Sequence, residues 1–337
     1  MSWYHIPGNE QDVAVSTRVR FARNIREYPF PSRLDAPRAR DMINQIGEIL
    51  EKNGFICTDF AEISRITAQS LVEKHFASPA FVKESLPHSL FLNDPCNLSV
   101  MVCEEDHLRI QCILPGLSLR DAYEGASKIE SLLDSGFEFA FDERWGYLSG
   151  CPSNLGTAMR ASVMLSLPML TLRGRMEALS LQFGQTGLLL RGLYGEGTSP
   201  AGCLYQVSNR VTMGITEEEI ITRMEEATGA LIEAERRARD SITGRDLDEL
   251  TDRVSRAAGL LRHAHMLPAG EMLRLIGEVR LGAAMGILRD VRVEHLTALV
   301  VEAMPATLTL SADIPPKTDI EQDILRARMV RERIFGA

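Results

Sequence analysis

Ser16-Thr-Arg-Val-Arg20 is a short stretch in which two arginines flank one apolar residue. Side chains on a β-strand alternate between its two faces, so Arg18 and Arg20 would point the same way. Two adjacent guanidinium groups repel each other unless an anion lies between them, and the planar arginine fork suits phosphate oxygens. The segment therefore indicates a phosphate site, although an ordinary solvated strand edge would show the same pattern.

A second polar segment, Cys103-Glu-Glu-Asp-His-Leu-Arg-Ile-Gln111, places three carboxylates before a histidine and an arginine. A strand here would put alternate residues on one face, namely Glu105, His107, Arg109 and Gln111. A carboxylate beside a phosphate-binding arginine could act as a base and hold a cationic nucleophile. An acidic turn that precedes a strand explains the pattern equally well.

The third segment, Gly146 to Thr157, is rich in Gly, Pro and Asn and predicts a defined loop. In the residues that follow, Ala158 to Met164, we expect Arg160 to lie at or near the start of a helix that continues through Val163. Free backbone N–H groups at a helix start attract phosphate. Cys151 in the loop is either a thiol tuned for chemistry or an ordinary loop cysteine.

The fourth segment, Arg191 to Gly197, belongs to a stretch with glycines at 192, 195, 197 and 202, which predicts a lid loop. Arg191 and Glu196 would give this lid one cationic and one anionic contact, as a reaction between ATP and a guanidinium requires. Glycine-rich loops are common, so the pattern is weak alone. The sequence has neither a P-loop nor a protein-kinase H-R-D set, so scattered arginines would have to hold the phosphates.

Taken in order, these four segments resemble the ATP:guanido phosphotransferases, or phosphagen kinases, the superfamily of creatine and arginine kinases. The resemblance implies an α+β fold, with an antiparallel sheet flanked by helices and similar to glutamine synthetase, over residues 1–214. A small helical domain is expected over residues 215–337, where Thr216 and Glu219 form a capping box. Further helices are predicted over residues 246–266, 270–285, 293–304 and 319–335.

The resemblance also implies roles for individual residues. The ATP phosphate clamp would consist of five arginines, Arg18, Arg20, Arg109, Arg160 and Arg191. Nucleotide contacts are further expected from His75 and from the segments around the arginines, namely Ser16, Thr17, Val19, Ala161, Ser162, Val163, Met164, Gly192, Leu193, Tyr194, Gly195 and Glu196. A Mg²⁺ ion bound to the ATP phosphates would need no dedicated protein ligands.

The acceptor side of the reaction needs carboxylates. A guanidinium group is protonated at neutral pH and is then a poor nucleophile, so a base must take one of its protons. By resemblance, Glu105 is this base, and Glu196 is a second carboxylate that holds the acceptor. Cys151 matches the reactive cysteine that lies near the acceptor nitrogen.

Within the superfamily, two features favour the protein-arginine kinases, which phosphorylate arginine side chains of other proteins. The metabolite kinases carry a helical N-terminal domain, whereas here the Ser16–Arg20 segment begins at residue 16, so we expect no such domain and a more open acceptor site. The helical region after residue 215 is the second feature. Two alternatives are a kinase of a small free guanidino compound and a phosphoarginine-binding adaptor with a decayed active site.

Two positions depart from the family pattern. Cys103 stands where an asparagine usually precedes the two glutamates, and we expect activity to be retained because Glu105 is present. The R-D-x-x-R-A motif of an allosteric phosphoarginine pocket has a counterpart in Gln322, Asp323, Arg326 and Ala327. Because glutamine replaces the first arginine, we expect weaker activation by phosphoarginine.

The resemblance further implies a cytoplasmic homodimer that marks proteins with exposed arginines for a Clp-type protease, regulates the stress response and works with an activator protein. The formal net charge of −9 fits a cationic substrate and argues against nucleic-acid binding. No two cysteines have CxxC spacing, which argues against a structural zinc site and favours reduced cytoplasmic thiols. We expect neither a signal peptide nor a membrane helix, which needs ~18 consecutive apolar residues.

Overall fold

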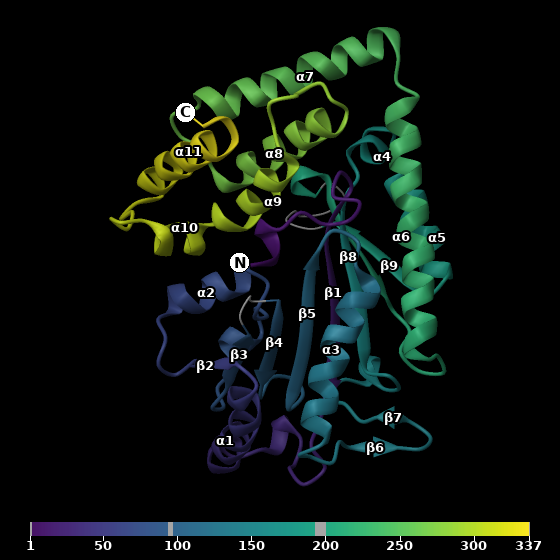
Figure 1. The fold of residues 1–337 in the computed structure, drawn as a ribbon, viewed down its shortest axis with the longest axis vertical. Helices are drawn as coiled ribbons and strands as arrows, with labels where there is room; N and C mark the ends of the chain where they lie inside the picture. Colours follow the sequence, from purple (N-terminus) through teal and green to yellow (C-terminus); the bar gives the residue numbers. More distant parts are fainter. Residues whose placement is uncertain (1, 94–96, 193–199, 337) are drawn as a thin grey trace.

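The computed structural model describes residues 2–93, 97–192 and 200–336, and its main element is an eight-stranded antiparallel sheet (Figure 1). The strand order is β2-β3-β4-β5-β1-β8-β10-β9. The strands are β1 (Ala14–Arg23), β2 (Phe55–Asp59), β3 (Ser89–Asn93), β4 (Leu98–Val102), β5 (Leu108–Pro115), β8 (Met159–Ser166), β9 (Leu188–Gly192) and β10 (Leu204–Asn209), and a separate hairpin pairs β6 (Phe141–Asp142) with β7 (Gly146–Tyr147).

The register of the sheet brings distant arginines onto one face. β1 lies at the centre, and its Arg20 stands opposite Gln111 of β5 on one side and Arg160 of β8 on the other. Directly opposed residues on neighbouring strands point to the same face of the sheet, whereas successive residues along one strand point to opposite faces. The register of β8 with β10, and of β10 with β9, therefore continues the face that carries Arg20 as far as the edge strand β9. Five arginines lie on this face: Arg18, Arg20, Arg109, Arg160 and Arg191.

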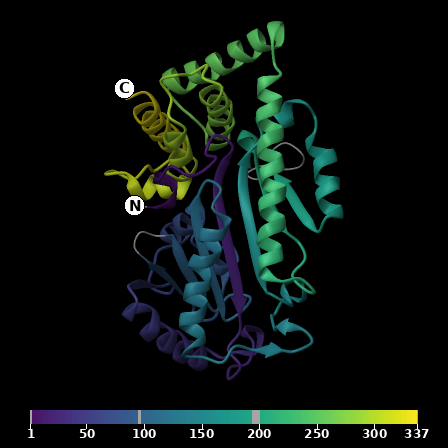
Figure 2. The same cartoon turned by 45° about the vertical axis from the view of Figure 1, so that its right-hand side comes forward.

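Some of the helices cover the opposite face of the sheet. The helices of the described residues are α1 (Ala36–Lys52), α2 (Arg65–Glu73), α3 (Leu119–Asp134), α4 (Pro168–Leu172), α5 (Met176–Gln185), α6 (Glu217–Asp240), α7 (Gly244–His263), α8 (Ala269–Ala284), α9 (Val293–Glu302), α10 (Pro305–Ser311) and α11 (Asp319–Phe335). Figures 1 and 2 show α3 in front of the sheet, and Figure 2 shows α6 in front of it as well. Their apolar faces share one hydrophobic core with the strands, which confirms the predicted sheet flanked by helices.

The helix predicted from about Arg160 through Val163 is wrong, because Met159–Ser166 form strand β8. β8 pairs with β1 and with β10, and every residue in it except Arg160 is buried. A strand buried on both faces lacks the polar alternation that distinguishes it from a helix in sequence. Arg160 is therefore presented by a strand and not by a helix N-terminus.

The helices predicted after residue 215 lie close to α6, α7, α8, α9 and α11, whereas α10 was not predicted. Helix α6 begins with the expected Thr216–Glu219 capping box. Helices α7, α8, α9 and α11 contribute to a second hydrophobic core, at the upper end of the sheet in Figure 1. By contrast, α6 packs on the sheet with the first core. The division at residues 214 and 215 stays a prediction. No helix in the described part of the chain is long and apolar enough to cross a membrane.

Candidate active site

Two adjoining cavities lie on the arginine-bearing face of the sheet. The larger, of about 540 Å³, is lined by Arg18, Arg20, Gln69, Val72, Glu73, His75, Ala77, Ser78, Pro79, Met101, Arg109, Gln111, Met304 and Pro305. The smaller, of about 220 Å³, is lined by Arg20, Phe21, Ala22, Glu105, Arg109, Cys151, Ser153, Asn154, Ala158 and Arg160. Arg20 and Arg109 belong to both, so one continuous site can accept a phosphate chain and a second reactant.

The guanidinium groups of this site crowd one another. Burial, and then the charges of Arg18 and Arg109, lower the pKa of Arg20 well below its ordinary value. Burial, followed by Arg191 and Arg109, also lowers the pKa of Arg160. The buried Nε of Arg20 has no hydrogen-bond acceptor in the described part of the chain. The repulsion among these guanidinium groups raises the free energy of the folded protein when no anion is bound, and a bound anion relieves it. A polyphosphate therefore fits this site.

Three successive carboxylates near the site do three different things. Residues 103–107 form a turn before β5, which confirms the acidic turn that was the alternative to a strand across these carboxylates. Buried Glu104 accepts a hydrogen bond from Nη1 of Arg109 at 2.8 Å and forms an ion pair with its Nη2. The side chain of Glu105 is 46% exposed and lies 3.8 Å from Nη2 of Arg109. Glu104 thus orients the arginine, and Glu105 stays accessible to a reactant.

Asp106 fixes the loop that carries Cys151. Its carboxylate accepts hydrogen bonds from the Ser149 hydroxyl at 2.8 Å and from the Gly150 amide at 2.7 Å. Cys151 follows directly, with its Sγ 3.1 Å from the hydroxyl oxygen of Ser153. This anchor holds Cys151 in the wall of the smaller cavity, together with Glu105.

His107 does not face the site, contrary to the strand expectation. It is fully buried, and its Nδ1 accepts a hydrogen bond from the amide of Ile25 at 3.0 Å. Its Nε2 donates to the carbonyl of Pro29 at 2.8 Å. These contacts give His107 a structural role behind the turn. Cys103 begins the turn with φ of 65°, a conformation that asparagine adopts more readily than cysteine.

His75 closes the larger cavity from the side of α2. Its carbonyl accepts a hydrogen bond from Nε2 of Gln111 at 2.8 Å, which ties it to the sheet. The wall beyond it comes from the C-terminal helices, since the Glu73 carboxylate accepts hydrogen bonds from the amides of Ala306 and Thr307. Met304 and Pro305 therefore line the cavity, and neither was predicted as a site residue.

Acid should destabilise the folded chain through His75. Burial, and then the charge of Arg18, lower the pKa of His75 to about 3, from an ordinary value of 6.5. Between these values the unfolded chain binds more protons, so the free energy of unfolding falls as the pH drops from about 6.5 toward 3. We expect urea denaturation to show a shallower fall for His75→Asn, which does not titrate and tolerates the φ of 64°. A slope equal to that of the wild type would contradict this assignment.

Several of the predicted nucleotide contacts point away from the cavities. Val19, Ala161 and Val163 are fully buried in the core on the helical face. The hydroxyl of Thr17 is also buried and donates to the carbonyl of Gly116 at 2.7 Å. Other predicted residues, Leu193, Tyr194, Gly195 and Glu196, lie outside the described residues.

The segment that corresponds to the phosphoarginine motif is engaged within the protein. Arg326 is 1% exposed, and its guanidinium donates to the carbonyls of Ala303 and Leu267 at 2.8 and 2.9 Å. It also donates to Oε1 of Gln322 at 3.2 Å and pairs with Asp323. Acceptors within the chain thus occupy all three nitrogens of Arg326.

The architecture and the site together describe a phosphotransferase with an arginine clamp and a carboxylate beside it. Residues 39–238 match the family described as ATP:guanido phosphotransferase, C-terminal catalytic domain. Residues 247–336 match the protein-arginine kinase McsB C-terminal domain. The first match places the chain in the class of ATP:guanido phosphotransferases.

Curated relatives narrow this class. A protein-arginine kinase of Halothermothrix orenii is 39% identical, with 98% of this chain and 96% of the relative covered. Another, of Desulforamulus reducens, is 38% identical, with 98% and 95% covered. The chain belongs to the protein-arginine kinase family.

Solved structures agree on the fold. The duplicated taurocyamine kinase of Schistosoma mansoni, with bound transition-state analogue components, matches with a TM-score of 0.61 and 26% identity. That match covers 78% of this chain and 39% of the duplicated one. Lombricine kinase, at 23% identity, also has a TM-score of 0.61 over 72% of this chain and 71% of its own, and shows the fold alone.

Proposed function

We propose that the protein transfers the γ-phosphate of ATP to guanidinium groups of arginine residues in other proteins. The observation that carries this proposal is the smaller cavity, which the accessible carboxylate of Glu105 lines together with Arg20 and Arg160. A cationic acceptor fits beside the carboxylate, and an anionic donor fits beside the arginines. The names of the curated relatives support a protein acceptor.

The reaction then follows from these positions. Glu105 takes one proton from the acceptor guanidinium, and the lone pair released on that nitrogen forms the N–P bond. The bond between the γ-phosphorus and the β–γ bridging oxygen breaks, and ADP leaves with the electron pair of that bond. Arg20, Arg109 and Arg160 neutralise the charge of the transferring group, which is the main demand of phosphoryl transfer.

ATP would lie in the larger cavity, with its phosphates along Arg18 and Arg20 and its base toward His75. A Mg²⁺ ion would arrive with the nucleotide and add further positive charge to its phosphates. The described residues contain no cluster of three or more ligating side chains, and a magnesium ion held by phosphates and water needs none. Cys151 would lie near the acceptor nitrogen, and Glu196 would hold the acceptor.

Mass spectrometry for phosphoarginine is the direct test, with acid-free handling because the N–P bond is labile. We expect phosphoarginine in an unfolded model protein after incubation with ATP and Mg²⁺. Label that enters only free arginine would instead support a kinase of a small guanidino compound. If Glu105→Ala left all phosphorylation unchanged, the phosphoarginine-binding adaptor would be favoured.

We further propose the family's cellular setting for this chain. It would act as a cytoplasmic homodimer, respond to an activator protein and mark its substrates for a Clp-type protease. The overall acidic charge is consistent with substrates that expose arginines. A light-scattering measurement of mass would test the dimer.

Activation by phosphoarginine is expected to be weak in this chain. Gln322 donates to the carbonyl of Pro305 at 3.1 Å and to the Thr309 hydroxyl at 3.0 Å, and supplies no charge for a phosphate. Losing one charge-assisted hydrogen bond costs ~1.5–3 kcal/mol of binding, which is roughly 10- to 150-fold in affinity. We expect a phosphoarginine peptide to activate Gln322→Arg more strongly than the wild type in a kinase assay. Equal responses would contradict this proposal.

A further inference from the structure

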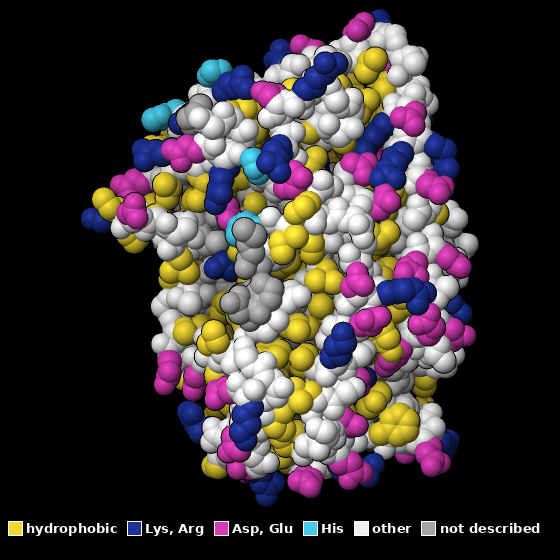
Figure 3. Space-filling view, viewed as in Figure 1, with side chains coloured by type: hydrophobic (Ala, Val, Ile, Leu, Met, Phe, Trp, Pro, Cys, Tyr) yellow, Lys and Arg dark blue, Asp and Glu magenta, His cyan; other side chains and the backbone are white. Residues whose placement is uncertain are grey.

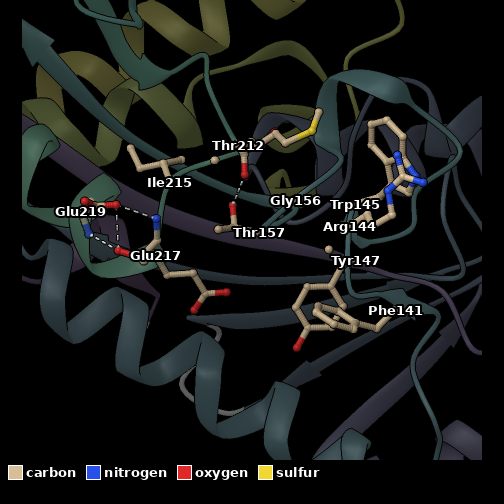
Figure 4. A pocket seen from close by; sticks show the side chains of 14 residues that line it. Phe141, Arg144, Trp145, Tyr147, Gly156, Thr157, Thr212, Ile215, Glu217 and Glu219 are labelled. Atoms are coloured by element: carbon tan, nitrogen blue, oxygen red, sulfur yellow. Dashed lines mark hydrogen bonds between the residues drawn. The ribbon is translucent and has the colours of Figure 1, made fainter.

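A third cavity, of about 390 Å³, lies outside the two that hold the reaction. It is lined by Phe141, Arg144, Trp145, Gly146, Tyr147, Gly156, Thr157, Thr212, Met213, Gly214, Ile215, Thr216, Glu217 and Glu219. In Figure 4, Phe141 and Tyr147 lie together on one side, and the Glu217 carboxylate points across toward Tyr147. We call this cavity the hairpin groove, because the β6–β7 hairpin supplies its aromatic side.

The hairpin groove exposes large apolar side chains. Phe141, Trp145 and Met213 are 48%, 45% and 44% exposed. Phe141 packs edge-to-face on Tyr147 with ring centroids 5.3 Å apart, which holds the aromatic surface in place. Figure 3 shows hydrophobic side chains gathered over the hairpin, with acidic side chains beside them. Contiguous exposed apolar surface with a polar rim is typical of a binding surface.

The charge around the groove is mainly negative. Glu219 lines it, and Glu143 is exposed on the hairpin between its two strands. Glu217 also lines it, but its carboxylate lies 3.6 Å from the Arg23 guanidinium and accepts a hydrogen bond from the Tyr123 hydroxyl at 2.8 Å. Arg144, the basic side chain in the lining, lies over the Trp145 ring at 5.7 Å. An apolar groove with an acidic rim is complementary to a segment that carries both hydrophobic and basic side chains.

One loop separates the hairpin groove from the smaller active-site cavity. Ser153, Asn154 and Ala158 line the active-site cavity, whereas Gly156 and Thr157 line the groove. The loop is held tightly, because Tyr147 donates its amide to the carbonyl of Gly156 at 2.8 Å. At Gly156 itself, with φ of 102°, a Cβ would lie 2.2 Å from the carbonyl oxygen of Thr212. The groove lies on the side of the sheet that carries α6, so a chain leaving the acceptor position would have to pass around this loop to reach it.

We propose that the hairpin groove binds the substrate protein beside the arginine that is phosphorylated. Its occupant is an extended segment with a hydrophobic side chain for the aromatic surface and a basic side chain for the acidic rim. The proposal rests on the proposed function and adds a preference for the sequence around the acceptor. The main determinants of this preference are Trp145, which contacts the hydrophobic side chain, and Glu143, whose negative charge attracts the basic side chain.

Two acceptors test this directly in the full-length protein. One is Nα-acetyl-argininamide, which is too short to leave the acceptor cavity. The other is a peptide of about 15 residues, which spans roughly 50 Å when extended, with one central arginine and with leucine and lysine on both flanks. We expect Trp145→Ala and Glu143→Lys each to lower kcat/KM for the peptide roughly five- to tenfold, through KM. Both variants should act on Nα-acetyl-argininamide as the wild type does.

The control variant is Leu181→Ala, which removes another exposed apolar side chain, on α5 and outside the groove. It should leave kcat/KM for both acceptors unchanged. Unchanged use of the peptide by both groove variants would overturn the proposal, and so would an equal loss with the two acceptors, since that would indicate a disturbed catalytic loop. A wild type that phosphorylates neither these two acceptors nor an unfolded model protein would instead refute the proposed function.

Discussion

Glu105→Gln should lower kcat on a protein substrate by roughly a thousandfold, because general-base catalysis by a positioned carboxylate contributes about 10²–10⁴-fold. Glutamine keeps the size of the side chain and can still accept a hydrogen bond, but it cannot take a proton from the acceptor. The affinity for ATP should change little, since the Glu104 carboxylate and not that of Glu105 holds Arg109 at hydrogen-bond distance. Phosphoarginine formation gives kcat, and calorimetry gives the affinity for ATP.

Two control variants make this test specific. Glu48→Gln changes an exposed carboxylate on α1 and should leave both quantities unchanged. Glu104→Gln removes the charge that orients Arg109, so it should weaken ATP binding as well as kcat. Full activity of Glu105→Gln would assign the base to another group.

Local signals along the chain were sufficient to predict several elements. The Thr216 capping box marks the start of α6, because its side-chain bonds are made within one turn of helix. Apolar stretches over residues 97–102 and 108–114 also predict strands, and they lie close to β4 and β5. These features depend on residues that are close together in the sequence, so the local sequence pattern is enough to predict them.

The site needed more than local pattern. Whether Arg160 lies on a helix or a strand depends on the pairing of β8 with β1 and β10, which brings together residues far apart in the chain. The sequence likewise does not indicate which of the three successive carboxylates is buried. Only the structure shows that Glu104 is the buried partner of Arg109. Met304 and Pro305 lie more than 200 residues from His75 and join the site only through tertiary packing.

Arg20→Gln should abolish most activity while it stabilises the protein without ligand. Arg20 lies among like charges, and its buried Nε lacks an acceptor in the described residues. Replacing it with a neutral side chain relieves this repulsion, so we expect the free energy of unfolding to rise by about 1 kcal/mol. In the transition state the same guanidinium neutralises phosphate charge, and an arginine in that role contributes roughly 10³–10⁵-fold to kcat.

The two effects have opposite signs, which makes the outcome diagnostic. Urea denaturation without nucleotide should show the gain in stability, and thermal melting with Mg–ATP should show a smaller upward shift than in the wild type. Arg210→Gln, an exposed arginine that lines neither active-site cavity, should change neither result. If ATP raised the melting temperature of Arg20→Gln as much as that of the wild type, Arg20 would not bind its phosphates. A loss of both stability and activity would indicate that Arg20 supports the fold, because removing a crowded positive charge can weaken the protein only if that side chain makes stabilising contacts.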